Sequence, residues 1–376
     1  MTDMIADSAS RFARMAALLA QDPANPNLLA DTARAAFAEN RFDDAADLLD
    51  RASAQAPLPP ELQHLAGLVA MRREQWGDAA GRYAALLENG ADGPPVRFNL
   101  AWSLAMEKRF DEALEALDEA TSEALPQAAQ LEVQLLHEKG EVDRAMERAR
   151  PLLARHPDHR GLNAAVSTLA IDMEDEALAA ETAARAPDHP EAMVTLATLA
   201  MVDDDTDTAA RLFTAALAQS PNSPRALIGH GLSELLGGDK LAGAHELDRG
   251  AEIWGDHLGS WIAAGWAYLL AGDAASAKAR FERALALDDS FAESHGSLAV
   301  IDILEGRVDE AARRTAVARR LDRESFSTAL AAMLLAAGKG DKERAAKIFE
   351  TALNMPMDEK GRTLAKSLAG MASRLG

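Results

Sequence analysis

Histidines occur in three places with spacings that resemble metal-binding or catalytic motifs. Two stretches, beginning at His137 and His245, start with His-Glu, as the zinc-binding motif H-E-x-x-H does. Neither contains the second histidine that this motif requires. The third place is His156 and His159, whose imidazoles are separated by a proline and an aspartate. Because proline favours a turn here, we interpret these two histidines as structural residues.

Three aspartates, Asp203, Asp205 and Asp207, have the spacing of the first three ligands of a calcium-binding loop. Such a loop needs a glycine at its sixth position for a sharp turn and a glutamate at its twelfth position as a bidentate ligand. These two positions hold Thr208 and Thr214. We therefore expect a solvated acidic turn here and no calcium site.

The chain has no cysteine, which excludes disulfides, thiolate nucleophiles and zinc–thiolate centres. Residues 338–342 contain glycine and lysine but lack the spacing of a phosphate-binding loop. No G-x-S-x-G sequence of a serine hydrolase is present. The sequence therefore predicts a protein that is not an enzyme and has no catalytic residue, cofactor or metal site.

The charge of the chain limits its partners. Its 376 residues include 60 Asp and Glu against 39 Lys and Arg, so the net charge is −21 at pH 7. Such a surface repels phosphate backbones and anionic lipids, and we expect no nucleic-acid partner and no membrane insertion. No stretch approaches 18 consecutive apolar residues, and the first 20 residues lack the apolar core of a signal peptide. These features predict a cytoplasmic protein.

A short phrase that ends in a small residue recurs along the chain, in forms such as Gly-Asp-x-x-x-Ala. The final residues of the phrase are Ala45, Ala79, Ala113, Ala145, Ala177, Ala209, Gly243, Ala277, Ala311 and Ala345. Successive positions differ by 34, except for three differences of 32 between Ala113 and Ala209, and a second small residue precedes most of them by twelve positions. This period indicates a repeat protein in which each unit is a pair of helices.

The residues around the repeated phrase indicate how each pair of helices packs. In the second helix a small residue is followed by a bulky one four positions later and a small one seven positions later, as in Ala209, Phe213 and Ala216. This spacing places all three on one helical face. Glycine between the helices, as at Gly272, allows a left-handed helix end, and Asp273 can cap the second helix. Each unit is therefore predicted to be a helix–turn–helix hairpin.

This pattern resembles the tetratricopeptide repeat, a family whose units read W-x₂-L-G-x₂-Y, then A-x₃-F, A and P. The unit that begins near Leu258 carries the matching residues Trp261, Ala264, Gly265, Tyr268, Ala277, Phe281 and Ala284. It departs from the pattern at Asp289, which replaces the proline, whereas the unit from Pro190 keeps Pro221. The resemblance covers residues 26–359 and implies an all-α fold, a right-handed α-solenoid (a superhelix) of about ten hairpins with a capping helix at each end.

We expect five segments along the chain. A capping helix precedes three regular repeats, two irregular repeats with the shorter period of 32 follow, and five regular repeats lead to a second capping helix. These segments are residues 1–25, 26–125, 126–189, 190–359 and 360–376. The expected units begin near residues 26, 60, 94, 126, 158, 190, 224, 258, 292 and 326. Repeat arrays need such ends because the outer face of a terminal repeat meets water.

In this family the first helices of successive hairpins line a concave face, so the resemblance implies groove residues at fixed positions of each unit. The apolar residues at such positions are Phe98, Trp102, Met106, Ile228, Leu232, Leu235, Ile262, Trp266, Leu269, Val300, Ile303, Leu330 and Leu334. A shift of one residue in register would place them in the core between hairpins, so both interpretations stay open. Trp102 and Trp266 are expected to point away from the second helix of their hairpin, and Trp261 is expected to lie in the core.

The resemblance and these apolar positions predict a protein-interaction scaffold or adaptor that binds a helical or extended apolar segment of a protein or peptide. Acidic surroundings favour a basic partner. Two alternatives stay open. One is an accessory subunit that presents substrates to a separately encoded enzyme, such as a glycosyl- or sulfotransferase, and the other is a scaffold that assembles with itself.

Overall fold

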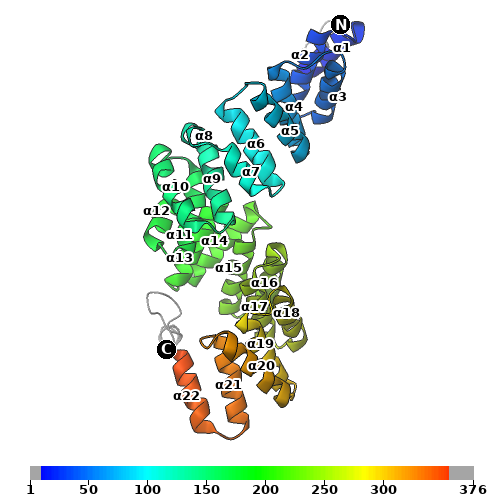
Figure 1. The fold of residues 1–376 in the computed structure, drawn as a ribbon. Coiled ribbons are helices and arrows are strands. Elements are labelled where there is room, and N and C mark those ends of the chain that lie inside the picture. Colours follow the sequence, from blue (N-terminus) through cyan, green and yellow to red (C-terminus); the bar gives the residue numbers. More distant parts are fainter. Residues whose placement is uncertain (1–9, 355–376) are drawn as a thin grey trace, which may run out of the picture. The chain divides into compact units, whose positions relative to one another are not determined.

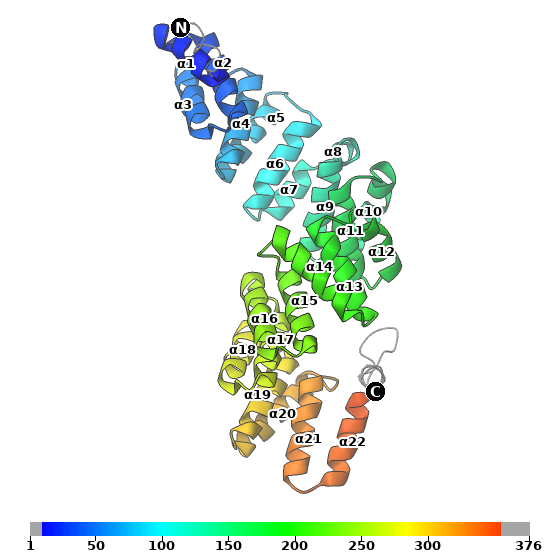
Figure 2. The same cartoon turned by 180° about the vertical axis from the view of Figure 1, so that it is seen from behind.

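A computed structural model describes residues 10–354, and every regular element within them is a helix, which confirms the predicted all-α fold. In Figures 1 and 2 the helices form successive hairpins, such as α2 with α3 and α21 with α22. The chain divides into two compact units, an amino-terminal unit of residues 1–192 and a carboxy-terminal unit of residues 193–376. Within each unit, most helices that follow one another in the chain pack against each other, as a solenoid requires.

The helices of the amino-terminal unit are α1 (Arg11–Gln21), α2 (Pro26–Ala38), α3 (Phe42–Ser53), α4 (Pro60–Arg72), α5 (Trp76–Glu88), α6 (Pro94–Met106), α7 (Phe110–Ala116), α8 (Glu119–Ala124), α9 (Pro126–Glu138), α10 (Val142–Arg155), α11 (Arg160–Asp172) and α12 (Glu176–Ala184). Helix α13 (Pro190–Val202) begins at the division between the units. The helices after it are α14 (Thr206–Gln219), α15 (Pro224–Gly237), α16 (Lys240–Trp254), α17 (Leu258–Leu270), α18 (Ala274–Leu287), α19 (Ala292–Leu304), α20 (Val308–Leu321), α21 (Phe326–Gly338) and α22 (Lys342–Leu353).

Local sequence explains where the first helices begin. Helices α2, α4, α6, α9, α13 and α15 each begin at a proline. Proline suits the first helical position because the N–H that it lacks would have no partner within the helix, and its fixed φ is already helical. Five of the second helices are capped at their start by an aspartate whose side chain accepts a hydrogen bond from a backbone N–H in the first turn: Asp175, Asp205, Asp239, Asp273 and Asp341.

Each turn within a hairpin contains one residue with a left-handed backbone, at φ between 56° and 99°. These residues are Asn40, Glu74, Lys108, Gly140, Glu174, Asp204, Gly238, Gly272, Gly306 and Gly340. The next residue donates its N–H to a carbonyl in the last turn of the first helix, as Asp273 does to Tyr268 at 2.9 Å. This arrangement satisfies carbonyls that would otherwise lack a partner at the helix end. The turn therefore marks the same point of every repeat.

These turns correct the expected lengths in the middle of the chain. The positions of successive left-handed residues differ by 34, except for a step of 32 before Gly140 and a step of 30 before Asp204. The expected steps of 32 on either side of Ala177 are therefore wrong, because the turns give steps of 34 and 30 there. The small residue that lies five positions after the turn is Ala179, which is fully buried, whereas Ala177 is exposed. The fifth hairpin accordingly begins near residue 160 and has a short second helix, α12, of 9 residues.

Small residues let the two helices of a hairpin approach closely. In the seventh hairpin, a Cβ atom added at Gly231 would lie 2.8 Å from the carbonyl oxygen of Gly243, and one added at Gly243 would lie 2.6 Å from the oxygen of Gly231. In the eighth hairpin, Gly265 makes room for the ring of Phe281, which is fully buried. The predicted role of the two small-residue positions is confirmed by these contacts.

The first predicted capping segment contains α1, which begins after the cap Ser10. The backbone N–H of Phe12 donates to Oε1 of Glu39 at 2.8 Å, and Leu19 is buried. Helix α1 thus closes one side of the first hairpin within the described residues. The second predicted capping segment, residues 360–376, lies outside the residues that the structure describes.

Candidate functional site

Ten of the thirteen predicted groove residues lie on four first helices of the carboxy-terminal unit, α15, α17, α19 and α21. All of them except Leu232 form a continuous apolar layer, because two buried clusters share Trp266 and Leu269 on their borders. The first cluster joins α15 to α19 and the second joins α17 to α21. We call these residues the apolar floor: Ile228, Leu232, Leu235, Ile262, Trp266, Leu269, Val300, Ile303, Leu330 and Leu334.

Burial divides the apolar floor into core and surface. Ile262 and Val300 are buried, so these two residues belong to the core and not to an open groove. Leu232 is exposed, and the other seven are half-buried. The layer therefore packs the first helices together while most of its members keep part of their apolar surface accessible.

The two tryptophans of α17 differ in their surroundings. Trp261 is buried and donates its Nε1–H to the carbonyl oxygen of Gly255 at 2.8 Å, so the predicted core position is confirmed. The ring centroid of Trp266 lies 5.6 Å from that of Phe281, which is on the second helix of the same hairpin. The expectation that Trp266 points away from that helix is wrong, because its ring packs against Phe281, whose own ring fills the space beside Gly265.

A row of exposed aliphatic residues borders the apolar floor. Val202, Leu236, Leu270 and Leu304 are 38, 51, 60 and 60% exposed. Each lies in the last turn of a first helix and directly follows the twelfth position of its repeat. We call these four residues the rim row. The sequence analysis missed them, although an aliphatic residue recurring once per repeat at this position was a signal that could have identified them.

The hairpin turns that follow the rim row are acidic. Asp203, Asp204, Asp205 and Asp207 follow Val202 without an intervening basic residue. The side chain and backbone N–H of Thr208 donate hydrogen bonds that hold the pKa of Asp205 below its usual value. Bonds from Ser276 likewise lower the pKa of Asp273, which follows Leu270. These hydrogen bonds favour the ionised carboxylates, so the rim row lies beside fixed negative charge.

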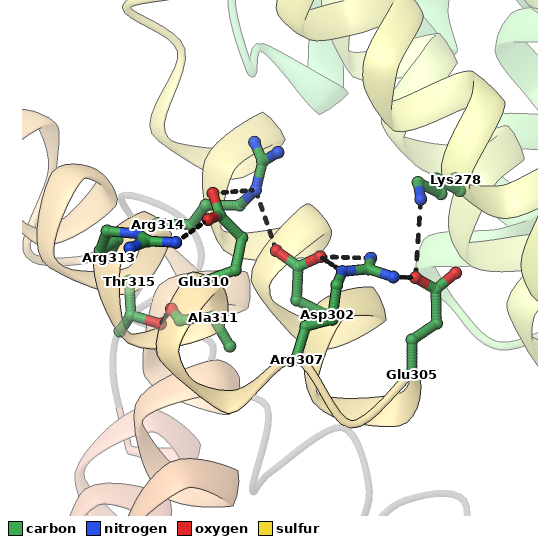
Figure 3. A network of polar contacts seen from close by, with 9 residues as sticks. All are labelled: Lys278, Asp302, Glu305, Arg307, Glu310, Ala311, Arg313, Arg314 and Thr315. Atoms are coloured by element: carbon green, nitrogen blue, oxygen red, sulfur yellow. Dashed lines mark hydrogen bonds and ion pairs between the residues drawn. The ribbon is translucent and has the colours of Figure 1, made fainter.

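A polar network involves Asp302 and Glu305, which lie on either side of the last rim residue, Leu304, in the sequence, and Figure 3 shows these two side chains. The adjacent Glu305 pairs with Lys278 at 3.5 Å and also with Arg307. Arg307 in turn donates to the buried carboxylate of Asp302 at 3.0 Å. The end of α19 is therefore connected through side chains to the preceding hairpin and to its own turn.

The amino-terminal unit contains the other three predicted residues, Phe98, Trp102 and Met106, along one face of α6. The ring centroids of Phe98 and Trp102 are 6.0 Å apart, and Phe98 packs against the core of this unit. Trp102 is 36% and Met106 48% exposed. These three residues form a second, smaller apolar surface.

Several side chains of the incomplete motifs have structural partners. Nε2 of His137 lies 2.7 Å from a carboxylate oxygen of Asp172. Nδ1 of His159 accepts the N–H of Leu162 at 3.1 Å and so caps α11. Within residues 10–354, no three His, Cys, Asp or Glu side chains are placed to hold a metal ion together. Over the same residues, no helix combines the length and apolar character that crossing a bilayer requires.

One cavity is lined by none of the predicted groove residues. Its volume is about 540 Å³, and it lies beside the turns of the first two hairpins. Its lining is charged and polar: Asn40, Arg41, Phe42, Asp43, Asp44, Arg72, Arg73 and Gln75. Arg41 pairs with Asp44 and Arg73 with Asp43, at 2.7 and 2.9 Å. Four of the lining charges therefore neutralise each other in pairs.

Comparison with known sequences identifies the repeat. Two models of the tetratricopeptide repeat match this chain, one over residues 7–69 and the other over residues 64–129, 169–224 and 194–256. Together the matches cover more than half of the chain. No curated protein matches it.

Solved structures with a similar fold are helical-repeat proteins. The dimer of human IFIT1 with m7Gppp-AAAA is 12% identical, with a TM-score of 0.52 over 89% of this chain and 91% of that chain. The Cut9 chain of the APC/C assembly Cut9–Hcn1 is 11% identical, with a TM-score of 0.43 over 93% and 90%. MamA is 20% identical, with a TM-score of 0.36 over 44% of this chain and 90% of that chain. At such identities, the likeness to IFIT1 shows the fold alone.

Proposed function

Because the chain belongs to the tetratricopeptide repeat family, we propose that it is a protein-interaction scaffold. In this proposal an apolar segment of a partner protein lies against the first helices of the carboxy-terminal unit. The chain contributes a binding surface and no catalytic group. The partner segment is helical or extended, since both kinds of peptide bind to apolar surfaces of this type.

The observation that carries the proposal is the apolar floor together with the rim row. Large aliphatic side chains that recur on consecutive helices and stay accessible are unusual for a monomer, and such patches mark interaction sites. Covering the accessible part of a leucine such as Leu270 contributes about 1 kcal/mol by the usual area relation. Several such contacts, with the half-buried Trp266 among them, supply the favourable energy that a bound segment needs.

The surface on α6 is a second contact point in this proposal. Trp102 and Met106 expose apolar surface, and Trp is a residue type that often dominates binding energy at interfaces. Phe98 packs against the core, and its ring contacts the indole ring of Trp102. A partner with two apolar segments would occupy both surfaces.

The IFIT1 structure contains a capped RNA, but we expect no such ligand for this chain. Its net charge is −21. The turns beside the apolar floor are acidic, and they would repel phosphates instead of neutralising them. The charge therefore favours a protein partner.

Site-specific crosslinking tests the proposal. Because the chain has no cysteine, Leu232→Cys and Ile253→Cys each create a single attachment point for a maleimide-benzophenone crosslinker. Leu232 belongs to the apolar floor, and Ile253 is an exposed residue near the end of a second helix. We expect crosslinked partners from a lysate of the source cells at position 232 and not at position 253. Identical products at both positions, or none at 232, would contradict the proposed binding surface.

A further inference from the structure

We propose that the rim row is the contact line for a cationic amphipathic helix of a partner protein. This inference rests on the proposed function and specifies the chemistry of the segment that binds. Val202, Leu236, Leu270 and Leu304 supply the apolar contacts. The acidic hairpin turns directly after them supply the charge that selects lysine and arginine.

The position of the rim row leaves its side chains accessible to a ligand instead of burying them in the core. Each of its residues directly follows the residue at the twelfth position of its repeat. These twelfth residues are Met201, Leu235, Leu269 and Ile303, and all four are half-buried. The twelfth residues pack the first helices together. The rim residues instead project from the last turn of the same helices and keep up to 60% of their surface accessible. Their apolar surface contributes little to packing within the chain.

Length favours a helix of moderate size. Directly packed helices lie roughly 10 Å apart, so four first helices separate the ends of the rim row by at least roughly 30 Å. An α-helix of about 20 residues has this length. Leucines spaced three and four residues apart on one face of such a helix would meet the rim residues in turn.

The charge of the turns beside the rim row determines which charge the partner helix should carry. The turns after the four rim residues, residues 203–207, 237–240, 271–273 and 305–307, contain seven acidic and two basic side chains. One of the basic residues, Arg307, is already bound to Asp302 and Glu305. The excess is greatest beside Val202, where four aspartates lie within five residues. A helix with basic residues flanking its apolar face is complementary to this border, and an acidic helix is repelled.

The test uses a defined probe and matched variants. The probe is a fluorescein-labelled 20-residue Leu/Lys peptide with its leucines on one helical face, and binding to the full chain is measured by anisotropy. Two further peptides serve as comparisons: one with the same composition in scrambled order, and a Leu/Glu counterpart. The test variant is Leu236→Ser/Leu270→Ser/Leu304→Ser. Its control is Ile253→Ser/Leu321→Ser/Phe326→Ser, which changes residues of 43–47% exposure at the opposite ends of the hairpins.

We expect the amphipathic Leu/Lys peptide to bind at least fivefold more tightly than the scrambled one, and the Leu/Glu peptide not to bind. The rim variant should weaken binding at least tenfold, and the control variant should bind like the unchanged protein. Asp203→Asn/Asp204→Asn/Asp207→Asn should weaken binding severalfold at 50 mM salt and make it less sensitive to salt. Circular dichroism verifies that every variant keeps its helix content.

Three results would overturn the inference: no binding of the Leu/Lys peptide, equal binding of the scrambled peptide, or equal losses in the rim and control variants. A dimer of the unchanged protein that the rim variant abolishes would also overturn it, because the row would then join two copies of the chain. If the peptide fails while crosslinking at position 232 still captures a partner, the cationic-helix inference falls and the proposed scaffold function stands.

Discussion

The carboxylate of Asp302 and the guanidinium of Arg314 join the two helices of the ninth hairpin, with Oδ2 and Nε 2.9 Å apart (Figure 3). Asp302 is almost fully buried and also accepts a hydrogen bond from Arg307. Arg280 occupies the position of Arg314 in the preceding repeat and binds the buried Asp248 at 2.8 Å. The eighth and ninth hairpins therefore carry an arginine at the same repeat position, and each of these arginines binds a buried aspartate.

Removing the arginines should cost more than removing the whole network. Arg307→Leu/Arg314→Leu leaves the buried carboxylate of Asp302 without a cationic partner, and we expect the ninth hairpin to lose about 3–5 kcal/mol of stability. Adding Asp302→Leu should restore most of the loss, because an apolar group replaces the unpaired charge. Native-state hydrogen exchange of α19 and α20 measures both effects. Arg313→Leu, which removes an exposed side chain that pairs with Glu310, should leave the exchange unchanged.

The crossing of α15 and α16 should not tolerate a methyl group. Gly231→Ala or Gly243→Ala places a Cβ atom against a backbone oxygen of the other helix, so each should destabilise the hairpin by about 1–3 kcal/mol. Gly237→Ala is the matched control, since nothing lies within 4 Å of its added Cβ atom. That variant should be neutral or slightly more stable. Thermal unfolding compares the three, and equal midpoints would contradict the close approach.

Two alanines in the fifth hairpin distinguish the register seen in the structure from the one expected from sequence. Ala179→Val should destabilise the hairpin by about 1–3 kcal/mol, because the buried side chain has no room for two more methyl groups. Ala177→Val lies on the exposed side of α12 and should change stability by less than about 0.5 kcal/mol. Urea unfolding measures both. If Ala177→Val destabilised the protein more than Ala179→Val, Ala177 and not Ala179 would be the residue packed between the helices.

Acidification should destabilise the junction that His159 caps. Burial, and then the neighbouring His156 and His189, lower the pKa of His159 below its usual value. The unfolded chain therefore binds more protons than the folded chain near and below about pH 6.5, so stability falls as the pH falls through this range. Protonation of Nδ1 also removes the acceptor for the N–H of Leu162.

Replacing this imidazole tests that dependence. His159→Asn keeps a capping oxygen but does not titrate, so the stability of α11 should fall less steeply between pH 7.5 and 5.5 than in the unchanged protein. Hydrogen exchange of α11 at several pH values gives the two slopes. Equal slopes would show that His159 contributes nothing to the pH dependence.

Much of this fold follows from local sequence. Prolines mark the starts of six first helices, glycines and aspartates mark most turns, and the regular period of the small residues identifies the hairpins. Such signals act within one or two helical turns, so a single sequence contains them. The buried position of Trp261 also followed from the repeat pattern.

The sequence by itself determined the all-α hairpin repeat and the residue types at its two small positions, because backbone preferences and helical periodicity are local. Only the tertiary structure decided between Ala177 and Ala179, since an alanine-rich helix offers several small residues and packing selects one. Tertiary structure likewise divided the apolar first-helix residues of the carboxy-terminal unit into the buried Ile262 and Val300, seven half-buried residues, and the exposed Leu232 and rim row. Burial depends on which neighbouring helices cover a side chain, and that depends on contacts between repeats.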